Sequence, residues 1–271
     1  PVRPDRAYVT RRQVAMLEAG QSLTLDDALA QGWLPGTARL ALSLADRPAL
    51  DVAGIAGDLR RYPYACTEQI VSRATVGLLS AALRLPPDPG GADDAAVQSA
   101  LRRLANLQAA RGYFSAWSAM GPEDLWLSAY TVDFLLQARA AGLPVSQAPL
   151  DEGLTWLAQA FARADDSASG MAGAAYAAEV LARGGRLDLS NLRYFAEHSA
   201  GRLPTDLATA QLAGAFAAMG DRARAAVLIG DLGRPRPAGA DAPTDYGTPL
   251  RDDAAVLTLA ADTGLLPPAQ L

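Results

Sequence analysis

The chain has 271 residues, half of them hydrophobic, so it is long and apolar enough to bury a sizeable core. Its formal net charge of −5 argues against a nucleic-acid surface, which needs a clustered basic face. No apolar run approaches the roughly 20 residues that a membrane span requires.

Residues 1–49 have the pattern of β structure. The stretch RLALSLA (39–45) alternates, with Leu40, Leu42 and Leu44 on one face, and SLTL (22–25) alternates as well. Because two or three strands cannot bury a face alone, we expect this segment to belong to a β domain with further strands outside it. The chain also begins PVRPDRAYV, without a methionine or a signal-peptide pattern, so we expect a piece of a longer protein.

From residue 50 onward the hydrophobic period is helical. The predicted helices are 50–61, 66–84, 92–111, 122–141, 147–164, 170–184, 188–200, 205–219, 221–232 and 248–264. Proline- and glycine-rich stretches separate them, and carboxylates at 121–124 and 204–206 mark helix starts. Short connections and alanine-rich faces favour antiparallel helix pairs. No strict repeat is visible, so a closed array is favoured over a regular solenoid.

Cys66, the sole cysteine, stands in RYPYACTEQIVSRA (61–74) and allows three interpretations. It could be a buried thiol acting as a small hydrophobic side chain. It could be a nucleophile at a helix N-terminus, in which case His198 is the sole histidine available as its base. In the third interpretation Cys66 and Gln69 share one side of a helical turn. Loss of ammonia would then join the sulfur to the glutamine carbonyl as a thioester, which survives where water is excluded.

The motif resembles the thioester region of the α2-macroglobulin and complement C3 family, most closely its bacterial members. Pro63, Tyr64, Cys66, Glu68 and Gln69 carry the resemblance, followed by Ser72-Arg73. The stretches LPGTARLALSLADRPAL (34–50), GYFSAWS (112–118) and LWLSAYTVDFLLQARAAG (125–142) also resemble that family. Ala65 and Thr67 replace commoner residues, and neither change removes a reacting atom.

The resemblance implies a fold and a domain organisation. It implies a mainly α-helical α/α toroid of six helix pairs over residues 50–271, with the last pair missing because ten helices are predicted. Residues 1–49 would be part of a CUB-like β-sandwich into which the toroid is inserted.

The resemblance also implies a function and its residues. Cys66 and Gln69 would form the thioester, Glu68 would be the acid of the motif, and Tyr62 and Tyr64 next to Pro63 would shield the bond. The whole protein would be a broad-range protease inhibitor and no enzyme: cleavage of a bait segment elsewhere exposes the thioester, which binds the protease covalently. It would act in the periplasm, with any membrane anchor outside this segment, and it needs no cofactor or metal.

The resemblance further implies which nucleophile the thioester meets. Complement-like members have a histidine relay about a hundred residues after the cysteine, which here falls at residues 163–173, where there is no histidine. The acyl group should therefore form amides with lysine side chains of the protease.

An α/α-toroid enzyme is the alternative from another class. A cysteine hydrolase would use Cys66 with His198. A carbohydrate-active enzyme would need a carboxylate pair, for which Glu123-Asp124 and Asp165-Asp166 are candidates, although helix capping and solvated loops explain them better. Trp117, Trp126 and Trp156 could line a sugar site but are more typical of a core.

Overall fold

The computed structural model describes residues 9–38, 40, 42, 44, 51–83, 85, 92–233 and 245–265. Its internal contacts divide the chain into two units, Pro1–Leu50 and Asp51–Leu271. The two units are described separately below.

The first unit forms no β-strand in its described residues. Those residues include a short 3-10 helix, η1 (Asp27–Ala30), which Asp26 caps. Leu40, Leu42 and Leu44, the predicted inward face, are 67%, 56% and 81% exposed, and the residues between them lie outside the described part. The strand predicted over 39–45 stays a prediction, because residues 39, 41, 43 and 45 lie outside the described part. A strand also needs a neighbouring strand to satisfy its backbone N–H and C=O groups. Membership of a CUB-like domain stays a prediction.

The second unit is helical, and the ten helices among its described residues confirm the predicted ones, with ends that differ by a few residues. They are α1 (Val52–Arg61), α2 (Thr67–Leu79), α3 (Ala92–Leu107), α4 (Leu125–Ala140), α5 (Gln147–Ala162), α6 (Ala168–Arg183), α7 (Leu189–Ser199), α8 (Asp206–Ala218), α9 (Arg222–Gly230) and α10 (Pro249–Thr263), with a 3-10 turn η2 (Ala200–Arg202) after α7.

Side-chain caps fix where many of these helices begin. The side chains of Asp124, Thr205 and Thr248 each accept a hydrogen bond from the backbone N–H three residues later. Such caps satisfy N–H groups that the first helical turn leaves without partners. At the other end of α10, Gly264 stops the helix in the left-handed conformation, with φ 59°.

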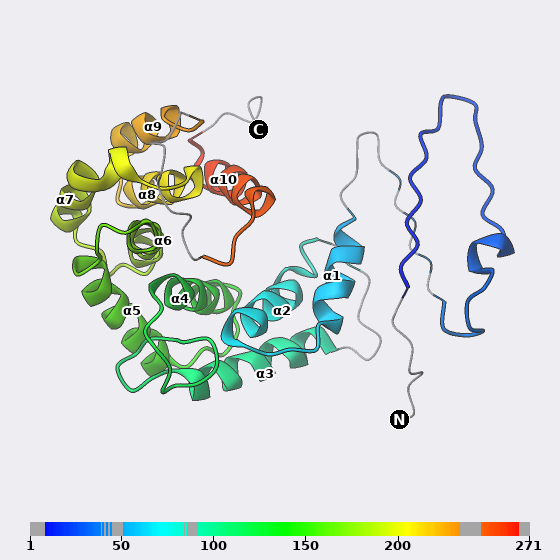
Figure 1. Cartoon of the computed structure of the whole chain (residues 1–271), viewed down its shortest axis with the longest axis horizontal. Helices are drawn as coiled ribbons and strands as arrows, with labels where there is room; N and C mark the ends of the chain where they lie inside the picture. The colour runs from blue at the N-terminus through cyan, green and yellow to red at the C-terminus, as the bar shows by residue number, and fades with distance from the viewer. Residues whose placement is uncertain are drawn as a thin grey trace. The chain divides into compact units, whose positions relative to one another are not determined.

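The helices alternate between two layers. The even-numbered helices contact one another in succession (α2 with α4, α4 with α6, α6 with α8, α8 with α10), while α3, α5 and α9 each pack on an even-numbered neighbour. Figure 1 shows α3, α5, α7 and α9 outside the series from α2 to α10. This alternation agrees with the inner and outer rings of the predicted toroid, although closure of a ring remains a prediction.

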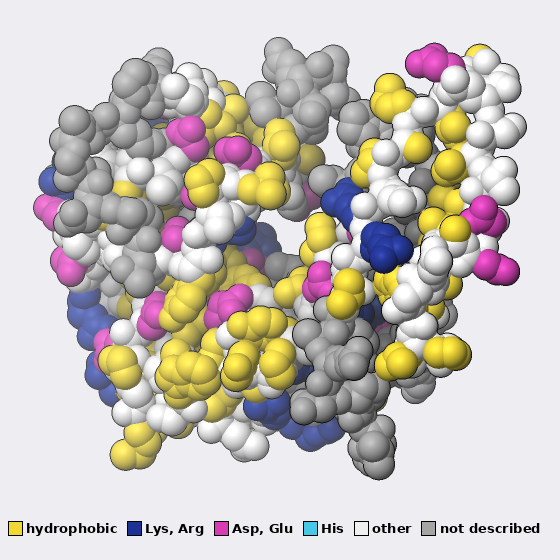
Figure 2. Space-filling model, turned by 45° about the vertical axis from the view of Figure 1, so that its right-hand side comes forward, with side chains coloured by type: hydrophobic (Ala, Val, Ile, Leu, Met, Phe, Trp, Pro, Cys, Tyr) yellow, Lys and Arg dark blue, Asp and Glu magenta, His cyan; other side chains and the backbone are white. Residues whose placement is uncertain are grey.

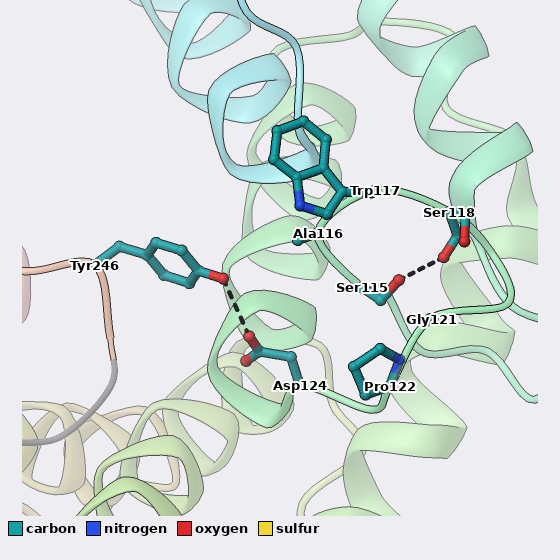
Figure 3. Close-up of a pocket in the computed structure, with 8 residues that line it drawn as sticks. All are labelled: Ser115, Ala116, Trp117, Ser118, Gly121, Pro122, Asp124 and Tyr246. Atoms are coloured by element: carbon teal, nitrogen blue, oxygen red, sulfur yellow. Dashed lines mark hydrogen bonds between the residues drawn. The ribbon is translucent and has the colours of Figure 1, made fainter.

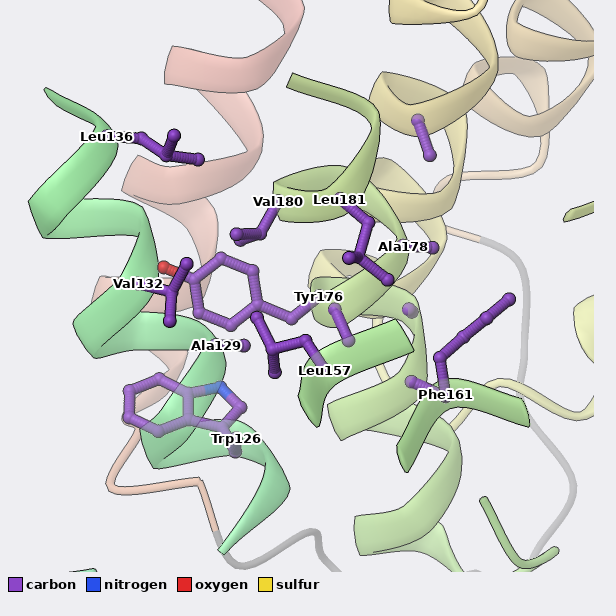
Figure 4. Packing of buried hydrophobic residues seen from close by; sticks show 14 of the residues in the cluster. Trp126, Ala129, Val132, Leu136, Leu157, Phe161, Tyr176, Ala178, Val180 and Leu181 are labelled. Atoms are coloured by element: carbon purple, nitrogen blue, oxygen red, sulfur yellow. The ribbon is translucent and has the colours of Figure 1, made fainter. Parts of the chain in front are cut away.

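The inner position explains why α4, α6 and α8 are apolar on nearly all sides. Alanine and glycine in α6 let α4 approach closely, since a Cβ at Gly173 would lie 3.0 Å from the Leu125 side chain. Tyr176 of α6 points towards α4 and packs near Trp126 and Val132 (Figure 4). Trp126 in turn packs against Tyr130 and Tyr176, with ring centroids 5.1 and 5.8 Å apart.

A buried ionic cluster joins α4 to α6 within this core. Asp133 accepts hydrogen bonds from the Tyr176 hydroxyl at 2.8 Å and from Arg183 at 2.7 Å. Arg183 also approaches Glu179, with Nε and Oε1 3.2 Å apart. Burial, opposed by Arg183 and reinforced by Asp133, raises the pKa of Glu179 to about 8.

Glu179→Gln should remove a pH dependence of stability. In the unfolded chain the Glu179 carboxyl ionises near its ordinary pKa, whereas in the folded protein it ionises near pH 8. Between these two pH values the folded state binds more protons than the unfolded state, so stability falls as the pH rises from one to the other. Relative to the variant, the free energy of unfolding of the parent should fall by on the order of 1–3 kcal/mol between pH 6 and pH 9. Urea unfolding at several pH values measures this, with the exposed Glu152→Gln as control; parallel curves for parent and Glu179→Gln would contradict it.

Charged side chains of both signs are dispersed over the face drawn in Figure 2. Some charged side chains are paired: Arg186 lies 2.8 Å from Asp151, and Arg60 lies 2.7 Å from Asp93. Among the helices that the structure describes, none is both long enough and apolar enough to cross a bilayer.

Candidate functional site

Cys66 occupies the N-cap of α2, and Gln69 lies directly across from it in the first turn. The Cys66 backbone is extended, and its side chain is buried, with 6% of the residue exposed. The Gln69 side-chain oxygen accepts a hydrogen bond from the Cys66 N–H at 3.1 Å. The reciprocal contact, from the Gln69 N–H to the cysteine side chain, is also present and is weak because sulfur is a poor acceptor. This capping box holds the Gln69 amide carbonyl on the same side of the turn as the thiol.

Thr67 fastens this turn to the segment GYFSAWS. Its N–H donates to the Ala116 carbonyl at 2.8 Å, and its hydroxyl donates to the Ser115 carbonyl at 2.6 Å. Thr67 is fully buried, so both bonds are shielded from water. The residue after the cysteine thus fixes a second segment, about fifty positions away in sequence, beside the thiol.

Residues 108–118 form a tight turn that α4 and α5 hold in place. Gly112 has φ 97°, and a Cβ there would lie 2.4 Å from the Glu152 carbonyl oxygen, so a larger residue would not fit. The buried Ser128 hydroxyl on α4 pairs with both the N–H and the carbonyl of Phe114, at 2.9 and 3.2 Å. The Ser115 and Ala116 carbonyls, which accept the hydrogen bonds from Thr67, therefore follow a turn that α4 and α5 hold in place.

Glu68 points along α2 into a network that reaches α4. Its carboxylate accepts from the Ser72 hydroxyl at 2.5 Å, and Ser72 is 2.9 Å from the Tyr130 hydroxyl. Burial raises the pKa of Tyr130 to about 12, so its proton stays on the phenol and is available for this network. The acid of the motif therefore helps to join α2 to α4.

The residues before the cysteine are exposed in this structure. Tyr62 and Tyr64 are 43% and 63% exposed, Pro63 between them is exposed as well, and the two rings meet edge to face with centroids 5.6 Å apart. Within this chain the two tyrosines are thus available to a further surface.

A pocket of about 200 Å³ lies next to the cysteine turn, at the N-terminal end of α4. It is lined by Ser115, Ala116, Trp117, Ser118, Gly121, Pro122, Asp124 and Tyr246. Figure 3 shows the Tyr246 hydroxyl directed at the Asp124 carboxylate, and these groups are 3.4 Å apart. Burial raises the pKa of Asp124, against the opposing bond from the Leu127 N–H. Tyr246 has a positive φ of 56°, which a non-glycine residue seldom adopts.

The structure does not bring His198 to Cys66. His198 is exposed on the outer helix α7, where its Nδ1 lies 2.7 Å from the Tyr194 carbonyl and its ring lies 4.0 Å from the Tyr194 ring. Helix α7 lies on the opposite side of the helical unit from α2 (Figure 1). The base that a cysteine hydrolase needs is therefore elsewhere in the fold.

The carboxylates and tryptophans considered for a sugar site have other roles. Asp124 caps α4 and Glu123 pairs with Arg111, while Asp165 bonds to Ser167 and Asp166 pairs with Arg202. Trp126 and Trp156 lie in the core, at 8% and 2% exposure, whereas Trp117 lies at the pocket. Among the described residues, no three His, Cys, Asp or Glu side chains gather as a metal site would require.

Sequence reasoning missed two contributors to this region. Thr67 looked like a mere departure from the family pattern, and no local signal connects it to residues 115 and 116. Tyr246 belongs to DYGTPL, where the neighbouring Gly247 indicates a turn, but its place beside Asp124 depends on how α10 packs.

Fold and site together define a helical domain with a buried cysteine at an inner helix N-terminus. No family model matches the chain. It is 32% identical to the alpha-2-macroglobulin of Xylella fastidiosa over 288 residues and to that of Escherichia coli over 286 residues. Each alignment includes 99% of this chain but 17% of the relative, so the chain spans about a sixth of the length of these proteins.

Solved structures give the same result. The E. coli alpha-2-macroglobulin structure that runs from domain MG7 to the C-terminus matches 83% of this chain with a TM-score of 0.73 and 32% identity, and the chain covers 37% of that structure. The Salmonella protein reacted with methylamine matches 83% with a TM-score of 0.72 and 32% identity, and 16% of it is covered. The chain therefore belongs to the alpha-2-macroglobulin family, as a segment of its C-terminal region.

Proposed function

We propose that Cys66 and Gln69 form an internal thioester, the reactive bond with which the full-length protein traps proteases. The capping box that holds the Gln69 carbonyl on the side of the buried Cys66 thiol carries this proposal. Sulfur attack on the Gln69 side-chain carbonyl, with loss of ammonia, would close the ring. Burial protects such an acyl group from water until it is exposed.

The relatives support this role. The Salmonella protein is described as reacted with methylamine, a small amine that opens thioesters, and E. coli proteins as activated by trypsin and by porcine elastase. For the present chain we propose that cleavage of a bait segment in the full-length protein exposes the Cys66–Gln69 bond. A nucleophile of the protease then takes the acyl group, Cys66 leaves as a thiol, and the inhibitor is consumed in one turnover. The protein would thus inhibit endopeptidases without being an enzyme.

The proposed setting is the periplasm, with any lipid anchor outside this segment. The partners are the attacking proteases and the other domains of the same full-length protein, which would cover the exposed Tyr62 and Tyr64. We also propose that residues 50–271 form the α/α toroid and residues 1–49 part of a CUB-like domain.

The activated thioester should prefer amines to hydroxyls. His198, exposed on α7 and paired with Tyr194, is not placed to relay the acyl group to an alcohol. Methylamine and glycerol, offered in parallel to freshly activated protein, should therefore give mainly a methylamide on Gln69, as peptide mass spectrometry can show. Abundant glycerol ester that disappears in His198→Ala would contradict this selectivity.

A further inference from the structure

The pocket beside the cysteine turn has the lining of a site for an ammonium group. Among the described residues that line it, Asp124 alone carries a charge, and the rings of Trp117 and Tyr246 flank it (Figure 3). A carboxylate and aromatic faces are the groups that bind organic cations in proteins. At about 200 Å³, the pocket exceeds several-fold the roughly 30 Å³ that one water occupies, so it admits the end of a side chain.

Asp124 can serve this pocket while it caps α4. Its Oδ1 accepts from the Leu127 N–H at 2.9 Å, which is the capping bond. Its Oδ2 faces Tyr246, whose hydroxyl donates at 3.4 Å, longer than the usual O–H···O distance. The Trp126 backbone N–H also interacts with this carboxylate, while the long contact from Tyr246 leaves Oδ2 able to accept from a stronger donor.

The pocket is fixed next to the proposed thioester. Two of its wall residues, Ser115 and Ala116, accept both hydrogen bonds of Thr67, the residue directly after Cys66. The pocket and the Cys66–Gln69 turn thus share residues 115 and 116, which line the one and hold the other.

Resting on the proposed function, we propose that this pocket receives the ε-ammonium group of the attacking lysine and that Asp124 binds it beside the thioester. One proton of the ammonium passes to the Asp124 carboxylate. The neutral nitrogen then attacks the Gln69 carbonyl carbon, a C–N bond forms and the C–S bond breaks. The electron pair of the broken bond stays on the Cys66 sulfur, which takes the second proton from nitrogen.

The test compares a cationic and a neutral nucleophile of similar size. Methylamine is an ammonium at neutral pH, whereas methoxyamine is uncharged, and release of the Cys66 thiol reports the reaction of each with the full-length protein. Asp124→Asn keeps a good helix cap and removes the charge. It should slow methylamine about tenfold relative to methoxyamine, the effect expected for one charge-assisted hydrogen bond. The segment contains no lysine, so its own side-chain amines do not compete.

Matched controls separate binding from structure. Asp188→Asn changes a capping aspartate of the same kind on the outer helix α7 and should leave both rates unchanged. Asp124→Ser, which also caps, should repeat the selective loss. Equal slowing of both nucleophiles by Asp124→Asn and Asp124→Ser, or no slowing, would overturn the inference. If the parent itself released no thiol with either nucleophile, the proposed thioester would be at fault instead.

Discussion

Cys66→Ala should abolish covalent capture of protease. The substitution removes the sulfur that would carry the acyl group and adds no bulk at Cys66, which is 6% exposed. Trypsin added to the full-length parent should give a complex that survives denaturing electrophoresis, whereas the variant should give none. Bait cleavage should proceed equally in both proteins, because it takes place outside this segment.

Gln69→Glu provides the matched test of the other partner. It keeps the length of the side chain and an oxygen that can accept from the Cys66 N–H, as Gln69 does at 3.1 Å. A carboxylate has no ammonia to lose, so no thioester should form and covalent capture should again be lost. A denaturation-resistant complex with either variant would show that another group links the protease.

Phe114→Ala should destabilise the domain and also expose the thioester to water. Phe114 is 1% exposed, and its removal leaves a cavity that should cost about 3–5 kcal/mol in the free energy of unfolding. The two residues after Phe114, Ser115 and Ala116, accept the hydrogen bonds from Thr67. A cavity at Phe114 should therefore loosen the contact that holds the Cys66 turn. Denaturant unfolding measures the first effect, and the appearance of free Cys66 thiol during storage measures the second.

Phe216→Ala is the matched control for this effect. Phe216 is fully buried in α8, and the substitution should cost a similar free energy of unfolding. It should leave thioester hydrolysis near the parental rate, because α8 contributes no residue to the pocket or to the Cys66 turn. Equal acceleration of hydrolysis by both substitutions would mean that global stability, and not the support at Phe114, protects the bond.

The helices could be predicted because their signals are local. Asp124 and Thr205 each stand just before an apolar run, where a carboxylate or hydroxyl predicts a helix cap, and each caps a helix in the structure. The capping box of Cys66 and Gln69 is equally local, since three residues of spacing place both groups on one side of a turn. The alternation of Leu40, Leu42 and Leu44 is a less local signal, because alternation gives a strand only when a partner strand is present.

The surroundings of the cysteine could not be predicted, because they depend on packing between distant segments. Thr67 meets Ser115 and Ala116 of the segment that joins α3 to α4, and Tyr246 reaches Asp124 from the segment that precedes α10. Neither contact leaves a mark in residue spacing. The position of His198 on an outer helix likewise follows from the alternation of layers and decides against its use as a base.

The intact mass of freshly prepared native protein tests the central claim most directly. A Cys66–Gln69 thioester makes the chain lighter than its sequence by one ammonia, leaves Cys66 unreactive to thiol reagents, and yields one free thiol and one methylamide on Gln69 after methylamine treatment. A chain at its full sequence mass, with Cys66 freely reactive from the start and no methylamine incorporated, would contradict the account.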